Sequence, residues 1–181
     1  MKYSISLLAV LWVMVQAGAV AQSRELVEVS FAYTRQPGSG SNQFALWIED
    51  AQGRYIKTLY ATRFTAQGGL ERRPQSIPQW VKQSGLKGMS RSQIDSFTGA
   101  TPQAGSLSYR WDGTDQGGAA VPSGEYHLYV EATFRNENRV VYQAVVQLGG
   151  NPQETQAEAQ YFGKDTAGRT MIGPVTVRYQ R

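Results

Sequence analysis

Apolar and polar positions alternate along most of the chain. Residues 26–34 place Val27, Val29, Phe31 and Tyr33 on one face, which is the two-residue period of a half-buried strand. The same period recurs over residues 44–49, 54–60, 107–111, 125–134, 139–148 and 175–179. About seven short strands with turn residues between them predict an all-β, immunoglobulin-like antiparallel β-sandwich.

The connection between residues 44–49 and 54–60 is short enough for a tight turn. Asp50–Gly53 fills it, and Gly53 supplies the positive φ angle that such a turn requires. The two segments are therefore predicted to form a β-hairpin.

The stretch between Thr65 and Gly105 interrupts the alternation. Loops longer than about 15 residues are uncommon and often functional. A first helical turn is predicted to be capped by Ser76 and to end at Gly85, and a second to run from Ser90 to Ile94. The sandwich is thus expected to carry a long loop and short-helix insertion.

The first residues predict export. Lys2 precedes an apolar run over residues 5–15, and Ala19 and Ala21 occupy the positions that a signal peptidase recognises. This run is too short to span a membrane, which takes about 20 apolar residues. We therefore predict a signal peptide over 1–21 and one periplasmic β-sandwich domain over 22–181, not membrane-spanning after cleavage.

Composition excludes several kinds of site. The 18 basic and 14 acidic residues are scattered, with a net charge of +4, so no nucleic-acid partner is expected. Because the chain has no cysteine, it has no disulfide and no thiolate metal site. His127, the only histidine, lies mid-strand and is interpreted as a strand residue, since one histidine without cysteine cannot build a usual zinc or copper site.

Residues 111–126 contain Trp-Asp-Gly, then Asp115, then Val-Pro-Ser-Gly-Glu-Tyr. This stretch resembles a connection in immunoglobulin-like domains of the flagellar hook-capping protein and of bacterial surface modules, which implies a sandwich but no function. Asp112 and Asp115 lack the spaced oxygen ligands and distal Glu of a calcium loop, so turn chemistry explains them better.

The segment Asp95-Ser-Phe-Thr-Gly-Ala-Thr101 lies inside the long insertion. It resembles the flavinylation signal Asp-x-x-(Ser/Thr)-Gly-Ala-Thr of the FMN-binding subunits of sodium-translocating NADH:quinone reductase and the related electron-transport complex. Asp95, Thr98, Gly99, Ala100 and Thr101 fill the five defined positions. The resemblance implies that an exported flavin transferase moves FMN from FAD onto Thr101 through a phosphodiester.

Local residues are compatible with such a modification. A threonine hydroxyl is a weak nucleophile, so the modifying enzyme must supply metal and base, and the chain must supply access. Gly99 and Ala100 leave the backbone uncluttered, and Pro102 biases Thr101 towards an extended conformation. The alternative is an ordinary polar turn. A solvent-accessible Thr101 favours modification, whereas a Thr101 buried in a strand favours the turn.

Taken whole, the chain resembles family 2271 of domains of unknown function, a family of predicted periplasmic proteins. Residues 44–59, residues 98–102 and the loop that begins at Trp111 carry the likeness. The family implies a β-sandwich and often a genomic setting with flavin transferases and membrane redox proteins.

Two functions follow from these observations. The leading hypothesis is an exported electron-transfer protein without a substrate of its own, carrying covalent FMN and working with a flavin transferase and a membrane redox protein. The alternative is a cofactor-free immunoglobulin-like structural or binding module of the envelope. Trp47, Trp80 and Trp111 are candidates for stacking on the flavin, although core packing is the more usual role of tryptophan.

Overall fold

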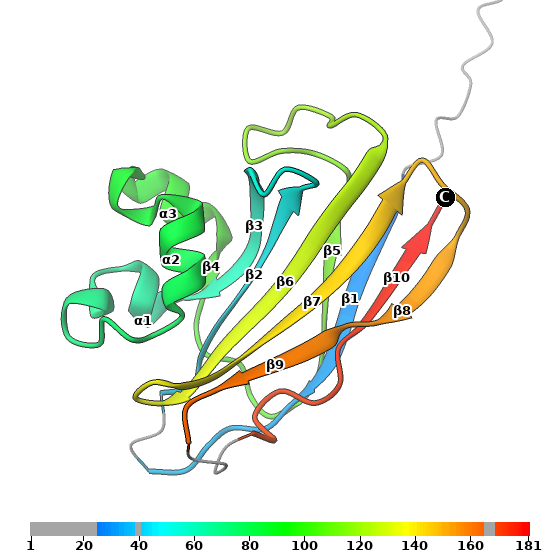
Figure 1. Cartoon of the computed structure of the whole chain (residues 1–181). Helices are drawn as coiled ribbons and strands as arrows, with labels where there is room; N and C mark the ends of the chain where they lie inside the picture. The colour runs from blue at the N-terminus through cyan, green and yellow to red at the C-terminus, as the bar shows by residue number, and fades with distance from the viewer. Residues whose placement is uncertain (1–24, 39–40, 165–168) are drawn as a thin grey trace, which may run out of the picture.

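A computed structural model describes residues 25–38, 41–164 and 169–181 (Figure 1). The predicted signal peptide, residues 1–21, lies outside the described residues. Two sheets of four and six strands pack against each other, which confirms the all-β sandwich. Within the described residues, no helix is long and apolar enough to cross a membrane.

The smaller sheet has the strand order β5-β1-β10-β8 and is antiparallel throughout. Its strands are β1 (Leu26–Tyr33), β5 (Gly105–Trp111), β8 (Gln153–Gln156) and β10 (Thr176–Gln180). The predicted apolar face of β1 is buried against the larger sheet, with none of its four side chains more than 4% exposed.

The larger sheet has the strand order β4-β3-β2-β6-β7-β9. Its strands are β2 (Gln43–Asp50), β3 (Tyr55–Thr62), β4 (Thr98–Gly99), β6 (Gly124–Arg135), β7 (Asn138–Leu148) and β9 (Glu158–Phe162). The predicted hairpin is β2–β3, with Gly53 at φ 74° in its turn. The sheet is antiparallel apart from the two-residue strand β4, which pairs with β3 in parallel at this edge.

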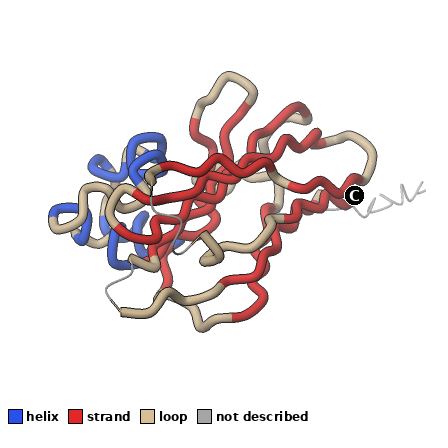
Figure 2. The backbone as a smooth tube through the Cα atoms, turned by 60° about the horizontal axis from the view of Figure 1, so that its bottom comes forward, coloured by secondary structure: helices blue, strands red, loops and turns tan. Residues whose placement is uncertain are grey.

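The insertion folds into five short helices. They gather beside the β4 edge of the larger sheet (Figure 1), and the helical segments form one group at the side of the strands in Figure 2. They are α1 (Arg63–Ala66), η1 (Gly69–Glu71), α2 (Pro78–Ser84), η2 (Leu86–Gly88) and α3 (Arg91–Phe97). Trp80 of α2 and Phe97 of α3 join Trp47 of β2 in a second apolar core on the outer face of the sheet. All eight residues of β2 are therefore buried, since the main core covers its other face.

The start of α2 differs from the predicted cap. Ser76 does not cap the helix; the N-cap residue is Ile77, with φ 43° and no side-chain cap hydrogen bond. The carboxylate of Glu131 on β6 accepts instead from the backbone N–H groups of Gln79 (3.3 Å) and Trp80 (2.9 Å). Because free N–H groups at a helix start attract negative charge, Glu131 ties α2 to the sheet.

The other helix ends follow the sequence. Gly85 ends α2 with φ 65°, in the left-handed conformation that glycine adopts without strain. Ser90 caps α3 in a reciprocal capping box with Gln93, and the helix extends beyond the predicted Ile94 to Phe97. Since β4 follows directly, the segment from residue 95 to residue 101 runs from helix to strand to loop.

Candidate functional site

Asp95 lies on the exposed surface of α3, near the end of the helix. Its Oδ1 accepts a short hydrogen bond from Gln67 Nε2, and its Oδ2 lies 3.8 Å from Arg91 Nε one turn earlier. The Asp95 side chain remains 48% exposed. The first residue of the motif therefore presents a carboxylate that another protein can reach.

The next two defined positions form β4. Thr98 pairs with Ala61 and Gly99 pairs with Thr62, at the edge of the larger sheet. The hydroxyl of Thr98 is buried, and within the described structure it has no hydrogen-bond partner. The fold thus gains no hydrogen bond from this hydroxyl.

Gly99 is required by close packing against Tyr60 on β3. A Cβ atom at this position would lie 2.7 Å from Tyr60 Cε2. The Tyr60 hydroxyl donates a 2.7 Å hydrogen bond to the carbonyl oxygen of Ala100, which fixes the backbone just before Thr101. Burial raises the pKa of Tyr60 to about 12, so the hydroxyl keeps its proton at neutral pH.

Thr101 follows on backbone without regular secondary structure and is half-buried. Within the described residues, the Thr101 hydroxyl forms no hydrogen bond with another protein group. Thr101 borders a hollow of about 530 Å³. The acceptor predicted from the sequence is thus in a loop beside a hollow, and not in the interior of a strand.

The hollow collects residues from four parts of the chain. Besides Thr101, the lining residues come from the segment that leads from β1 into β2, from the start of β2, from α1 and from the loop after η1. They are Arg35, Gln36, Pro37, Gly38, Ser41, Asn42, Gln43, Phe64 and Arg73. None of these lining residues is acidic. The sequence offers no local signal for their proximity to Thr101.

The buried amides of the hollow are fixed by hydrogen bonds. Asn42 Oδ1 accepts from Gln36 N at 2.7 Å, and Asn42 Nδ2 donates to Gln36 O at 2.9 Å. Gln43 Oε1 accepts from Thr62 Oγ1 at 2.7 Å and from Thr65 Oγ1 at 3.2 Å. These bonds couple the hollow to β3 and α1.

The three tryptophans considered for flavin stacking are buried, at most 1% exposed. Trp47 stacks on Tyr129, and Trp80 donates its indole N–H to Thr58. Trp111 donates to the carbonyl oxygen of Thr114. All three pack in the interior, and the aromatic ring that shares a hollow with Thr101 is instead the half-buried Phe64.

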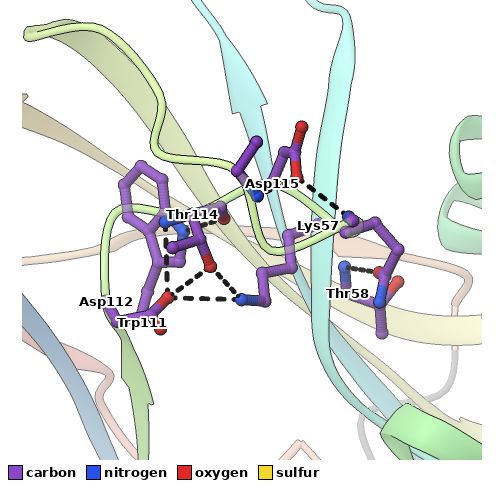
Figure 3. A network of polar contacts seen from close by, with 9 residues as sticks. Lys57, Thr58, Trp111, Asp112, Thr114 and Asp115 are labelled. Carbon is purple, nitrogen blue, oxygen red and sulfur yellow. Dashed lines mark hydrogen bonds and ion pairs between the residues drawn. The ribbon is translucent and has the colours of Figure 1, made fainter.

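The loop after Trp111 is a hydrogen-bonded turn (Figure 3). Asp112 Oδ1 accepts from Thr114 Oγ1 at 2.6 Å and from Lys57 Nζ at 3.2 Å. Asp115 Oδ1 accepts from two later backbone N–H groups of the same turn, each at 2.9 Å. Among the described residues, no group of three or more His, Cys, Asp or Glu side chains could hold a metal ion, and His127 belongs to no such group.

A family model matches most of the chain. The family described as predicted periplasmic protein (DUF2271) matches residues 24–164. The chain belongs to the DUF2271 family. The match confirms the resemblance to family 2271 and the periplasmic location; it includes residues 95–101, while β10 lies beyond it. No curated protein and no solved structure matches the chain.

Proposed function

We propose that this DUF2271 protein is a periplasmic electron carrier with FMN covalently attached at Thr101 by a partner flavin transferase. The observation that carries the proposal is the presentation of the motif. Asp95 and Ala100 are exposed, and the half-buried Thr101 lies on irregular backbone at a hollow, so the segment reaches the surface on both sides of β4.

The residues around Thr101 fit a flavin nucleotide. A volume of about 530 Å³ falls within the range of roughly 300–1,000 Å³ common for small-molecule sites. The lining combines the aromatic ring of Phe64 with two arginines, which suit an apolar ring and a phosphate, respectively. When bound, FMN would supply one- and two-electron redox chemistry.

Attachment is a phosphoryl-group transfer without change of oxidation state. Thr101 Oγ1 attacks the phosphorus on the FMN side of FAD, a new O–P bond forms, the pyrophosphate P–O bond breaks, and AMP leaves. The hydroxyl proton passes to a base of the transferase. Among the described lining residues there is no histidine or carboxylate, so this chain contributes the acceptor and the enzyme contributes base and metal.

In this role the protein has no substrate of its own. It binds the flavin, orients it and sets its electrostatic surroundings, while a membrane redox protein exchanges electrons with it. A half-open site in a loop suits such exchange, because both the transferase and the redox partner need access to the same flavin.

Co-production of the full chain with a flavin transferase tests the proposal. We expect flavin fluorescence in the protein band on a denaturing gel and a mass increase of one FMN less one water. Thr101→Ala removes the hydroxyl and should abolish the label, whereas Thr101→Ser keeps a hydroxyl at the same place and should retain it. A wild-type chain without covalent FMN would leave the cofactor-free envelope module as the better description.

A further inference from the structure

The hollow beside Thr101 holds positive charge that has no acidic partner. Arg35 is exposed and Arg73 is half-buried, and within the described residues no carboxylate oxygen lies within 4.0 Å of either guanidinium. Five other arginines of the described residues do pair with a carboxylate, for example Arg139 with Glu131 and Arg178 with Glu154. Two unpaired guanidinium groups at one hollow favour an anionic ligand there.

Arg73 is held in place by its own surroundings. Its guanidinium carbon lies 5.2 Å from the centroid of the Phe64 ring, within the range of a cation–π contact. Its backbone N–H donates to Gly69 O at 2.9 Å, and its carbonyl oxygen accepts from Ser76 N at 3.0 Å. A positioned guanidinium loses less conformational entropy on binding an anion than a freely moving one does.

The geometry points to a phosphate seat, in which Arg35 and Arg73 bind the phosphate group of FMN at Thr101. This inference rests on the proposed attachment, and it adds the residues that hold the nucleotide. A phosphodiester keeps one negative charge, and guanidinium groups match phosphate oxygens with paired N–H donors. Arg35 and Arg73 are therefore positioning residues that orient the flavin, and the ring of Phe64 lies in the same hollow.

A titration of the chain produced without a transferase tests the seat directly. FMN and riboflavin share the same ring system and differ by the phosphate, so quenching of their fluorescence measures what the phosphate adds. We expect FMN to bind at least roughly tenfold more tightly than riboflavin, the scale of one charge-assisted hydrogen bond. Higher ionic strength should weaken the binding of FMN and leave that of riboflavin unchanged.

Variants of the two arginines test whether these residues cause the preference for FMN over riboflavin. R73Q and R35Q should each reduce the affinity for FMN by roughly tenfold and leave that for riboflavin unchanged. R73K keeps the charge and should retain part of the preference. R135Q is the matched control: Arg135 lies in the adjoining hollow of about 240 Å³ that shares Ser41 and Arg73 but not Thr101, so the preference should remain.

Two outcomes would overturn the seat: equal affinities of the wild type for FMN and riboflavin, or an unchanged preference in the R35Q and R73Q double variant. Failure of the seat is distinguishable from failure of the proposed function. Covalent FMN on Thr101 without any effect of the arginines would overturn the seat alone. A phosphate preference without covalent attachment in the presence of a transferase would overturn the carrier function alone.

Discussion

The buried carboxylate of Glu131 predicts an unusual dependence of stability on pH. Its side chain is fully buried on β6, between the start of α2 and Arg139, whose Nε lies 3.1 Å from Glu131 Oε1. Burial raises the pKa of Glu131 from 4.5 to about 7, outweighing the backbone N–H groups of Trp80 and Gln79 and the charge of Arg139, which lower it.

The sign and size of the effect follow from this shift. The folded state holds the Glu131 proton more tightly than the unfolded state does, so the contribution to stability is fully present below pH 4.5 and is lost as the pH rises through about 7. At about 1.4 kcal/mol for each pKa unit, the free energy of unfolding should fall by about 3 kcal/mol between roughly pH 4.5 and pH 8.

Urea unfolding followed by tryptophan fluorescence at several values between about pH 5 and pH 8 measures this loss. Glu131→Gln is neutral at every pH and still offers an oxygen to the N–H of Trp80, so it should abolish most of the decline. Glu154→Gln, in an exposed ion pair on the other sheet, is the control and should keep it. A wild-type stability that is flat or rises across this window would refute the reasoning, as would an unchanged decline in Glu131→Gln.

Two further predictions concern the motif itself. Gly99→Ala should lower the free energy of unfolding by about 1–3 kcal/mol, because the added Cβ meets the Tyr60 ring. Gly88→Ala is the control, since nothing lies within 4 Å of its added Cβ, and it should change the stability little. Thermal unfolding of both variants measures the difference. Thr98→Val removes a buried hydroxyl without a partner in the described structure, so chemical unfolding should show equal or greater stability. A loss of more than about 1 kcal/mol in Thr98→Val would mean that the hydroxyl supports the fold.

Periodicity predicted strands such as β1 and β10 because each of them buries one face against the opposite sheet, as β1 does with Val27 and Phe31. It missed β4, β8 and β9, which have two to five residues and little apolar alternation. Such strands form because a longer neighbour offers unpaired backbone groups, and no local pattern carries that information.

The alternation of apolar and polar residues also gave an incomplete prediction of how β2 is buried. The two-residue period over residues 44–49 places Trp47 and Glu49 on the face opposite Phe44, and that face is buried as well, since the insertion covers it. The cap of α2 was missed for a related reason: the acceptor is Glu131, far away in the sequence and brought close by the position of β6. The burial of both faces of β2 and the capping of α2 by Glu131 depend on where the insertion packs. The residues next to each position in the sequence do not indicate this packing.

One part of the candidate site was visible in the sequence and another part required the structure. The motif from Asp95 to Thr101 is contiguous, so it was visible without a structure. Arg35, Phe64 and Arg73 reach the same hollow from segments far apart in the chain, and none of them belongs to a recognisable motif. The close approach of Gly99 to Tyr60 was likewise invisible, because it depends on the parallel pairing of β3 with β4.

The central claim is that Thr101 carries FMN, and peptide mapping tests it most directly. Trypsin cleaves after Arg91 and Arg110, so residues 92–110 form one peptide that contains Thr98 and Thr101. After co-production with a flavin transferase, fragmentation of this peptide should place a single FMN phosphodiester on Thr101. An unmodified peptide, or a label on any other residue, would contradict the account.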